Sequence, residues 1–96
     1  MYTIQEIQAR IVPIAREYGV KRVYLFGSYA KNTAGEESDI DILIEKGAPM
    51  SLLKLAGLRQ HFQDTLQLPV DLVTTTGIEK DFYNQISGTE VLLYEE

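Results

Sequence analysis

Residues 23–44 read VYLFGSYAKNTAGEESDIDILI, and this stretch says most about how the chain folds. An apolar run, Val23 to Phe26, ends at a Gly-Ser pair, and ten residues later Asp39-Ile40-Asp41 opens a second apolar run. Short apolar runs rich in β-branched and aromatic residues, bounded by glycine and polar loops, are typical of strands. The stretch therefore predicts two strands, over residues 21–26 and 39–45, joined by a polar loop.

Helical patterns flank these two strands. Residues 3–6, Thr-Ile-Gln-Glu, have the form of a capping box, and apolar residues then recur at helical spacing as far as Gly19. Pro13 lies inside this pattern and predicts a bend in the helix. A second helix is predicted between the N-cap Ser51 and Pro69. Its apolar face is expected to consist of Leu52, Leu55, Leu58, Phe62 and Leu66.

Two more strands and two minor helical segments complete the expected architecture. Residues 70–74 and 91–94 are predicted as strands, residues 29–32 as one helical turn, and residues 79–86 as a helix. Strands that alternate with helices indicate an α/β (α+β) fold, a small mixed sheet of about four strands with helices on one face or both. The order and direction of the strands do not follow from the sequence.

The composition limits the classes of protein to consider. A chain of 96 residues predicts one domain, residues 1–96, and 45% hydrophobic with 24% charged residues is typical of a globular protein. The absence of cysteine excludes disulfides and thiolate zinc sites and fits the cytoplasm. No apolar stretch is long enough for a signal peptide or a membrane span. A net charge of −5 argues against direct binding of nucleic acid.

Asp39 and Asp41 form a candidate metal site. Residues i and i+2 of a strand point to the same side, so the two carboxylates project together, with Cα atoms about 6.5 to 7 Å apart. Two such carboxylates repel each other, and a divalent cation removes the repulsion. Mg²⁺ prefers hard oxygen ligands and usually binds one or two carboxylates plus substrate phosphates. The alternative is a solvated strand end, but the upstream Gly-Ser pair favours a metal site.

Asp71 is the candidate for a third carboxylate. It lies in Val70-Asp71-Leu72-Val73, where a charged residue is costly unless something pairs with it. If the strands at 39–45 and 70–74 are neighbours, Asp71 can share the metal and accept a proton from an attacking hydroxyl. The alternative is an edge-strand aspartate that faces water.

Four residues are assigned to a phosphate-binding site. Gly27, directly after a strand, lets the backbone approach a phosphate without a Cβ in the way. Ser28 offers a hydroxyl and a backbone N–H, and Lys31 can reach a terminal phosphate. Ser38, next to Asp39, is assigned to the same nucleotide site. The tyrosines are expected to be core and boundary aromatics. Tyr29, which follows Ser28 directly, is the one candidate for stacking on a base.

These residues resemble a known family. Gly27-Ser28, ten residues, and Asp39-x-Asp41 resemble the signature of the DNA polymerase β superfamily of nucleotidyltransferases. The small size and the Asp71 strand resemble its minimal nucleotidyltransferase (MNT) branch. The resemblance implies a polymerase β-like nucleotidyltransferase fold and two Mg²⁺ ions held by Asp39, Asp41 and Asp71, with Asp71 also as base. It further implies that Gly27 and Ser28 hold the triphosphate of ATP or another NTP, whose α-phosphate is attacked in line with release of pyrophosphate.

The resemblance also implies a partner. Many MNT proteins are antitoxins of HEPN ribonuclease toxins and move AMP from ATP onto a tyrosine of the toxin, which makes homo- or hetero-oligomers an expectation. The chain departs from the family at Lys31, where Arg is usual, and at Asn32, where Gly is common. Lysine keeps the charge but loses the bidentate fork of arginine. Two alternatives stay open: a binding module that neutralises a partner without transfer, and nucleotidyl transfer to a small molecule.

Overall fold

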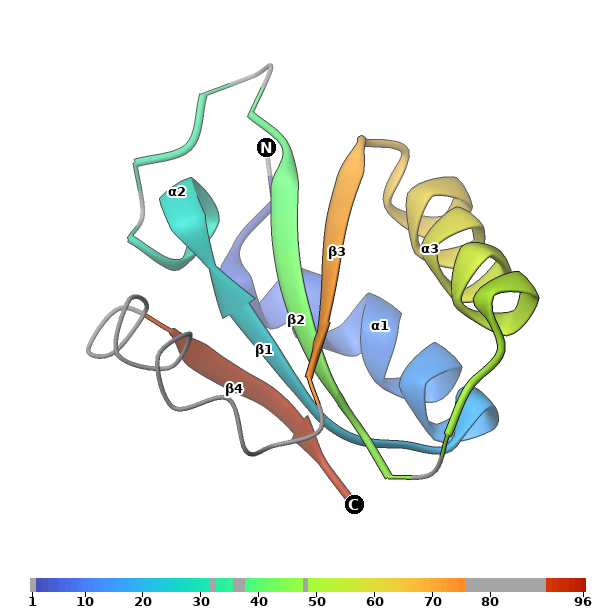
Figure 1. The fold of residues 1–96 in the computed structure, drawn as a ribbon. Helices are drawn as coiled ribbons and strands as arrows, with labels where there is room; N and C mark the ends of the chain where they lie inside the picture. Colours follow the sequence, from blue (N-terminus) through green and yellow to red (C-terminus); the bar gives the residue numbers. More distant parts are fainter. Residues whose placement is uncertain (1, 32, 36–37, 48, 76–89) are drawn as a thin grey trace.

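The structure, a computed structural model, describes residues 2–31, 33–35, 38–47, 49–75 and 90–96. The predicted helix at residues 79–86 lies outside this described part of the chain. The elements follow in the order α1 (Ile4–Tyr18), β1 (Val20–Phe26), α2 (Gly27–Ala30), β2 (Ile40–Lys46), α3 (Leu52–Leu66), β3 (Val70–Thr75) and β4 (Val91–Glu95) (Figure 1).

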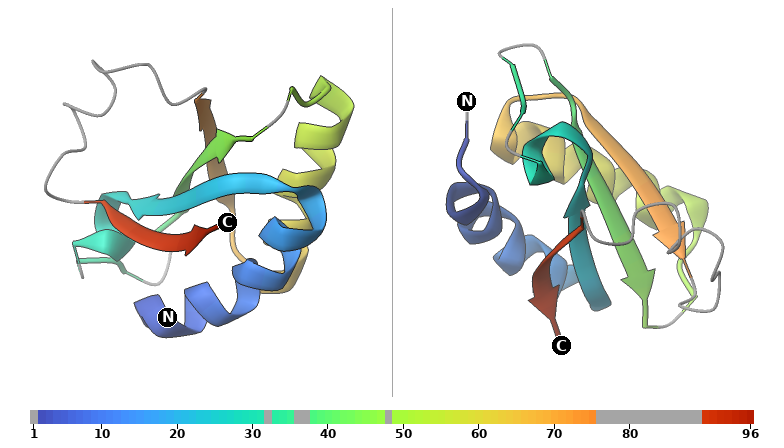
Figure 2. Two further views of the ribbon diagram at one scale, coloured as in Figure 1. Left: turned by 90° about the horizontal axis from the view of Figure 1, so that it is seen from below. Right: turned by 90° about the vertical axis from the view of Figure 1, so that its left-hand side faces the viewer.

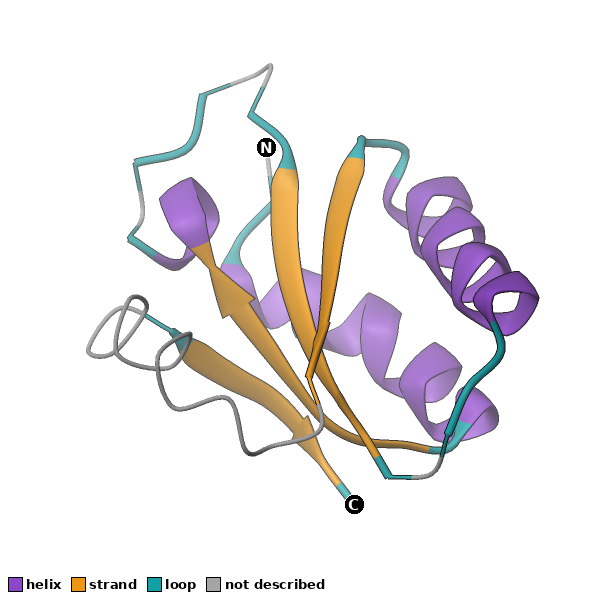
Figure 3. Ribbon diagram, in the orientation of Figure 1, coloured by secondary structure: helices purple, strands orange, loops and turns teal. Residues whose placement is uncertain are grey.

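The strands form one mixed sheet, as predicted, in the order β3-β2-β1-β4. β1 runs antiparallel to both β2 and β4, whereas β2 and β3 are parallel. The two long helices, α1 and α3, lie on the same face of this sheet (Figures 2 and 3). The crossover through α3 therefore brings the starts of β2 and β3 to the same end of the sheet.

The core lies between the sheet and these two helices. Alternate residues of β2 point into it, and Ile40, Ile42 and Ile44 are fully buried. The predicted apolar face of α3 is correct for Leu58, Phe62 and Leu66, which are also fully buried. It is wrong for Leu52, which is 86% exposed, because only from Leu55 onward does α3 pack against the core.

Local signals account for the bounds of α1. Thr3 Oγ1 accepts a hydrogen bond from the Glu6 N–H, and Glu6 Oε1 accepts one from the Thr3 N–H, which completes the predicted capping box. The helix ends at Gly19 in the left-handed conformation, with φ of 72°. It continues through Pro13 without a break. Within the described residues, no helix is both long enough and apolar enough to span a bilayer.

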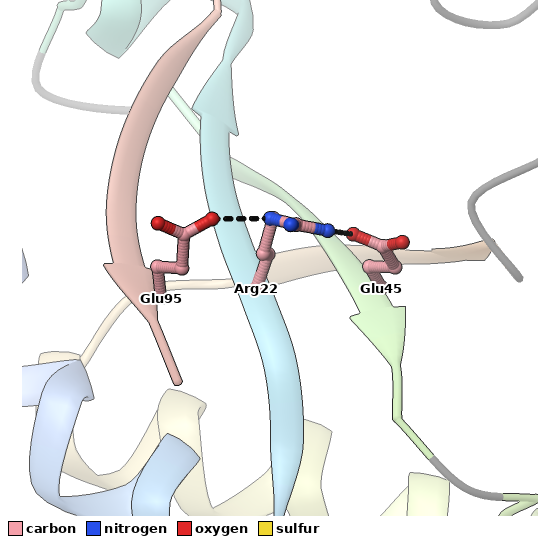
Figure 4. Close-up of polar contacts among 3 residues, drawn as sticks. All are labelled: Arg22, Glu45 and Glu95. Atoms are coloured by element: carbon pink, nitrogen blue, oxygen red, sulfur yellow. Dashed lines mark hydrogen bonds and ion pairs between the residues drawn. The ribbon is translucent and has the colours of Figure 1, made fainter.

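Arg22 ties three strands together on the sheet face opposite the helices (Figure 4). Its Nη1 lies 2.5 Å from Glu45 Oε2 on β2, and its Nε lies 2.6 Å from Glu95 Oε2 on β4. Both glutamates are also register partners of Arg22. Because Glu45 is only 7% exposed, its charge depends on this arginine, and the network favours one register of β2, β1 and β4.

Candidate active site

Two of the candidate carboxylates, Asp41 and Asp71, are neighbours at the end of the sheet where β1 ends and β2 and β3 begin. Asp41 is in register with Asp71 on the parallel strand β3 and with Phe26 on β1. Side chains of residues paired in register share one face of a sheet, so Asp41 and Asp71 project together. The condition set for Asp71, that its strand neighbours the Asp41 strand, is therefore met. Asp39 immediately precedes β2 instead of beginning it.

The charges of Asp71 and Asp39 act on the carboxyl group of Asp41. Partial burial raises the pKa of Asp41, and the nearby charges of Asp71 and Asp39 raise it further. Asp39 and Asp71 are exposed, whereas Asp41 is half-buried between them. The site thus concentrates negative charge at the strand ends, where a bound cation would stabilise the ionised form of Asp41.

Gly27 is packed against Asp41. Its φ is 74°, and a Cβ atom on it would overlap Oδ2 of Asp41 and lie 3.0 Å from the Asp41 Cγ. A side chain at position 27 is therefore excluded both by the backbone conformation and by the carboxylate. The sequence predicted a glycine that makes room for a phosphate. The structure shows that this glycine makes room for Asp41.

The segment after Gly27 differs slightly from the prediction. The helical turn expected at residues 29–32 is α2, which begins two residues earlier, at Gly27. Its end is closed by hydrogen bonds from the Lys31 N–H to the Gly27 carbonyl, at 3.1 Å, and from the Thr33 N–H to the Ser28 carbonyl, at 2.9 Å. Ser28 is partly exposed and Lys31 is exposed at the end of this turn. Both side chains therefore lie at the start of the loop that leads to Asp39.

Ser38 and Tyr29 have structural contacts of their own. Ser38 Oγ accepts a hydrogen bond from the Gly35 N–H at 2.8 Å, and the Ser38 N–H donates to the Gly35 carbonyl at 3.2 Å. Ser38 therefore binds Gly35 through both its side chain and its backbone, just before Asp39. Tyr29 is only 4% exposed and belongs to the core cluster, so its ring is not available for stacking on a base.

The donor chemistry of the site suits Mg²⁺. Within the described residues, no three carboxylate, imidazole or thiolate side chains are close enough to form a complete metal-ligand group. Mg²⁺ does not require one, because it commonly keeps waters and takes substrate phosphates as ligands beside one or two carboxylates. The hard carboxylate oxygens of Asp39, Asp41 and Asp71 match this preference, and the raised pKa of Asp41 marks the place where a cation would relieve repulsion.

Helix α3 contributes a contact that sequence reasoning missed. Arg59 Nε donates to the carbonyl of Val70 at 2.9 Å, and Gln63 Oε1 accepts from the Val70 N–H at 3.0 Å. Val70 directly precedes Asp71. A side chain that binds the backbone of another element leaves no local pattern in the sequence. The only signal is that Arg59 and Gln63 are four residues apart, a spacing that places them on the same face of a helix.

The family of nucleotidyltransferase domains matches this chain over residues 9–92, which include all the candidate site residues. The chain belongs to the nucleotidyltransferase family. The match agrees with the geometry above, since a carboxylate pair beside a glycine-serine turn is suited to holding a nucleotide triphosphate through metal ions.

Individual nucleotidyltransferases resemble the chain over most of its length. A candidate protein adenylyltransferase of Methanocaldococcus jannaschii is 47% identical over 75 residues, which are 78% of this chain and 81% of the relative. The protein adenylyltransferase MntA of Thermococcus cleftensis is 35% identical, over 82% of this chain and 84% of that protein. A crystal structure of a toxin–antitoxin with AMP-PNP superposes with a TM-score of 0.79 at 25% identity, over 93% of this chain and 73% of that one.

Proposed function

We propose that this nucleotidyltransferase is an antitoxin that transfers AMP from ATP to a tyrosine hydroxyl of a HEPN-type toxin, with Mg²⁺, in the cytoplasm. The observation that carries the proposal is the register pairing of Asp41 with Asp71 beside Gly27. The similarity to protein adenylyltransferases supports AMP as the transferred group. The toxin–antitoxin structure with AMP-PNP supports a toxin as the acceptor.

Each site residue has a role in this proposal. Asp39, Asp41 and Asp71 would hold two Mg²⁺ ions, and Gly27, Ser28, Lys31 and Ser38 would bind the triphosphate. When bound, Mg²⁺ supplies charge stabilisation on the phosphates and lowers the pKa of the attacking hydroxyl. The tyrosine oxygen forms a bond to the α-phosphorus, the bond to the β-phosphate oxygen breaks, and pyrophosphate leaves. Asp71 accepts the tyrosine proton.

A labelling experiment tests the proposal. The protein, labelled ATP, Mg²⁺ and a candidate HEPN-type toxin are incubated together, and the mass added to the toxin is measured by intact-protein mass spectrometry. We expect one or more AMP groups on the toxin. Asp41→Asn should lower the rate by at least about a thousandfold, because loss of a metal site removes several kcal/mol of transition-state stabilisation.

Asp64→Asn is the matched control, because Asp64 is an exposed carboxylate on α3 that contacts Gln60 and lies outside the site. It should transfer AMP at the wild-type rate. Undiminished transfer by Asp41→Asn would contradict the proposed site.

The alternative function is neutralisation by binding alone. Within the described part of the chain, β3 and β4 are the edge strands of the sheet, and the chain carries a net charge of −5; both features favour docking of a basic partner. The same experiment separates the two functions. Tight binding of the toxin without any added mass would favour the binding module.

A further inference from the structure

Helix α3 holds both backbone polar groups of one residue of β3. Arg59 Nε donates to the Val70 carbonyl at 2.9 Å, and Gln63 Oε1 accepts from the Val70 N–H at 3.0 Å. Arg59 and Gln63 are four residues apart, so their side chains leave the same face of the helix. The pair therefore acts on Val70 as a two-point clamp, defined here as Arg59 and Gln63.

The clamp lies at the β3 end of the strand order β3-β2-β1-β4. In a parallel ladder, successive residues direct their backbone groups alternately to the two sides of the strand. The Ile40 N–H of β2 donates to the carbonyl of Pro69 at 3.0 Å, so the groups of Val70 point away from β2. Among the strands that the structure describes, β3 lies at the edge of the sheet, so none of them pairs with these groups. Arg59 and Gln63 supply hydrogen-bond partners for the backbone of Val70, the residue directly before Asp71.

We propose that Arg59 and Gln63 are positioning residues for Asp71. The inference rests on the proposed function, in which Asp71 is the third carboxylate. The side chain of Val70 is 1% exposed in the core, and its backbone is held from α3, so the start of β3 is fixed from two directions. Asp71 itself is exposed, and no hydrogen bond among the described residues holds its carboxylate. Its position beside Asp41 therefore depends on the backbone that carries it.

The expected consequence of loosening the clamp is a loss of rate without a comparable loss of nucleotide binding. A displacement of about 1 Å in a reacting group can cost on the order of 10²-fold in rate. The main nucleotide-binding residues lie on α2 and on the loop before β2, which the clamp does not touch. A defect in the position of Asp71 should therefore lower kcat and leave the KM for ATP nearly unchanged.

The test compares substitutions that remove or retain the two hydrogen bonds. Gln63→Met and Arg59→Met keep an extended side chain but remove the acceptor and the donor, whereas Gln63→Glu and Arg59→Lys retain them. Gln60→Met is the control, because Gln60 is exposed on the same helix and its side chain donates to the exposed Asp64. We expect kcat to fall about 10- to 100-fold in the double Met variant and severalfold in each single one. The Glu, Lys and control variants should stay within about threefold of wild type.

A binding measurement gives a second readout that does not require transfer. The affinity for Mn²⁺ in the presence of AMP-PNP is measured by calorimetry for the same variants. We expect severalfold weaker binding in the double Met variant and no change in Gln60→Met. In an Asp71→Asn background, the Met substitutions should have no further effect, because the clamp acts through Asp71. A purely structural role would lower Tm but leave Mn²⁺ affinity and kcat unchanged.

Two outcomes overturn the positioning role. One is wild-type kcat and Mn²⁺ affinity in the folded double Met variant or, if that variant does not fold, in both single variants. The other is an equal loss of Mn²⁺ affinity in the wild-type background and in the Asp71→Asn background. If Asp41→Asn abolishes transfer while the Met variants match wild type, only the positioning role fails. If Asp41→Asn retains transfer, the proposed function fails instead, and the Mn²⁺ measurement still decides the role of the clamp.

Discussion

Gly27 lies directly against the carboxylate of Asp41, so that a Cβ atom on the glycine would overlap Oδ2 of the aspartate. The contact follows from the antiparallel pairing of β1 and β2, which places Phe26 opposite Asp41 and the next residue, Gly27, at the mouth of the site. Ten residues separate Ser28 from Asp39 in the motif. Gly27 and Asp41, at its two ends, are nevertheless packed against each other.

The first prediction concerns Gly27→Ala. The added methyl group has to displace the Asp41 carboxylate, and the residue would keep a φ of 74°, which is strained for alanine. We expect the free energy of unfolding to fall by about 1–3 kcal/mol and transfer to be lost. Urea denaturation and the mass-spectrometric assay measure the two effects.

Gly35→Ala is the control for this substitution. Gly35 lies in the loop between α2 and β2, and the nearest atom to a Cβ there is Ser38 Oγ at 4.0 Å. This variant should keep both stability and transfer. Full transfer by Gly27→Ala would show that the Asp41 carboxylate need not occupy its observed position.

The second prediction is that Asp41→Asn stabilises the metal-free protein. The pKa of Asp41 is raised in the folded state, by burial and then by Asp71 and Asp39, so the folded protein favours the protonated form. The associated stability is present below the unfolded pKa and is lost as pH rises through the raised folded value. At pH 7 the charge is therefore unfavourable, and asparagine removes it. We therefore expect a higher Tm for the variant in EDTA.

The pH and metal dependence check the cause of this stabilisation. The difference in Tm should shrink as pH falls toward the ordinary range of aspartate, where wild type is protonated as well. Mg²⁺ should raise the Tm of wild type more than that of Asp41→Asn, because binding to the folded state stabilises it. An equal or lower Tm for the variant at pH 7 in EDTA would contradict the repulsion inferred at the site.

Much of the fold could be predicted because its signals are local. The capping box at Thr3, the glycine stop at Gly19 and the apolar strand patterns all act within a few residues, and the observed strand bounds lie within one residue of those expected. The misplaced residue, Leu52, follows the helical apolar pattern but lies before the part of α3 that packs against the core. The apolar periodicity of a helix predicts which of its faces is buried. It does not predict at which residue of the helix that burial begins.

The site could be predicted only in part. Asp39 and Asp41 belong to one short segment, so strand geometry relates them directly. Asp71 is thirty residues from Asp41, and its place depends on which strand lies beside β2. A strand, helix, strand sequence does favour a parallel neighbour, but the sheet order decides whether the two strands are adjacent. The contact of Gly27 with Asp41 depends on the register of β1 and β2, which has no signature in the sequence.

The third prediction concerns Arg22→Met. Glu45 accepts a hydrogen bond from Arg22 and is nearly buried, so its charge would be left without its partner. The two glutamates that accept from Arg22 raise its pKa, so the guanidinium stays charged throughout the accessible pH range. We expect Arg22→Met to lower the urea midpoint. Glu95→Gln should lower the urea midpoint less, because Glu95 is exposed and can be solvated.

Lys21→Met is the matched control, since it removes the same charge from the adjacent, exposed position of β1. Its urea midpoint should remain close to that of wild type. Equal decreases of the urea midpoint in Lys21→Met and Arg22→Met would mean that the change in net charge accounts for the destabilisation, and not the loss of the ion pairs of Arg22 with Glu45 and Glu95.

The fourth prediction compares two tyrosines that lie near each other. The Tyr29 hydroxyl is buried and has no hydrogen-bond partner among the described residues, and burial, with a smaller effect of Tyr2, raises its pKa. The Tyr2 hydroxyl donates to the Leu66 carbonyl at 2.6 Å. Removing an unsatisfied buried hydroxyl relieves a desolvation penalty, whereas removing a bonded one loses an interaction. We therefore expect Tyr29→Phe to leave the free energy of unfolding unchanged or raise it by about 1 kcal/mol, and Tyr2→Phe to lower it by about 0.5–1.5 kcal/mol.

Urea denaturation of the two variants measures this difference in the free energy of unfolding. Transfer by Tyr29→Phe should match wild type because the Tyr29 ring lies in the core. A loss of stability in Tyr29→Phe as large as that in Tyr2→Phe would show that the Tyr29 hydroxyl has a partner in solution.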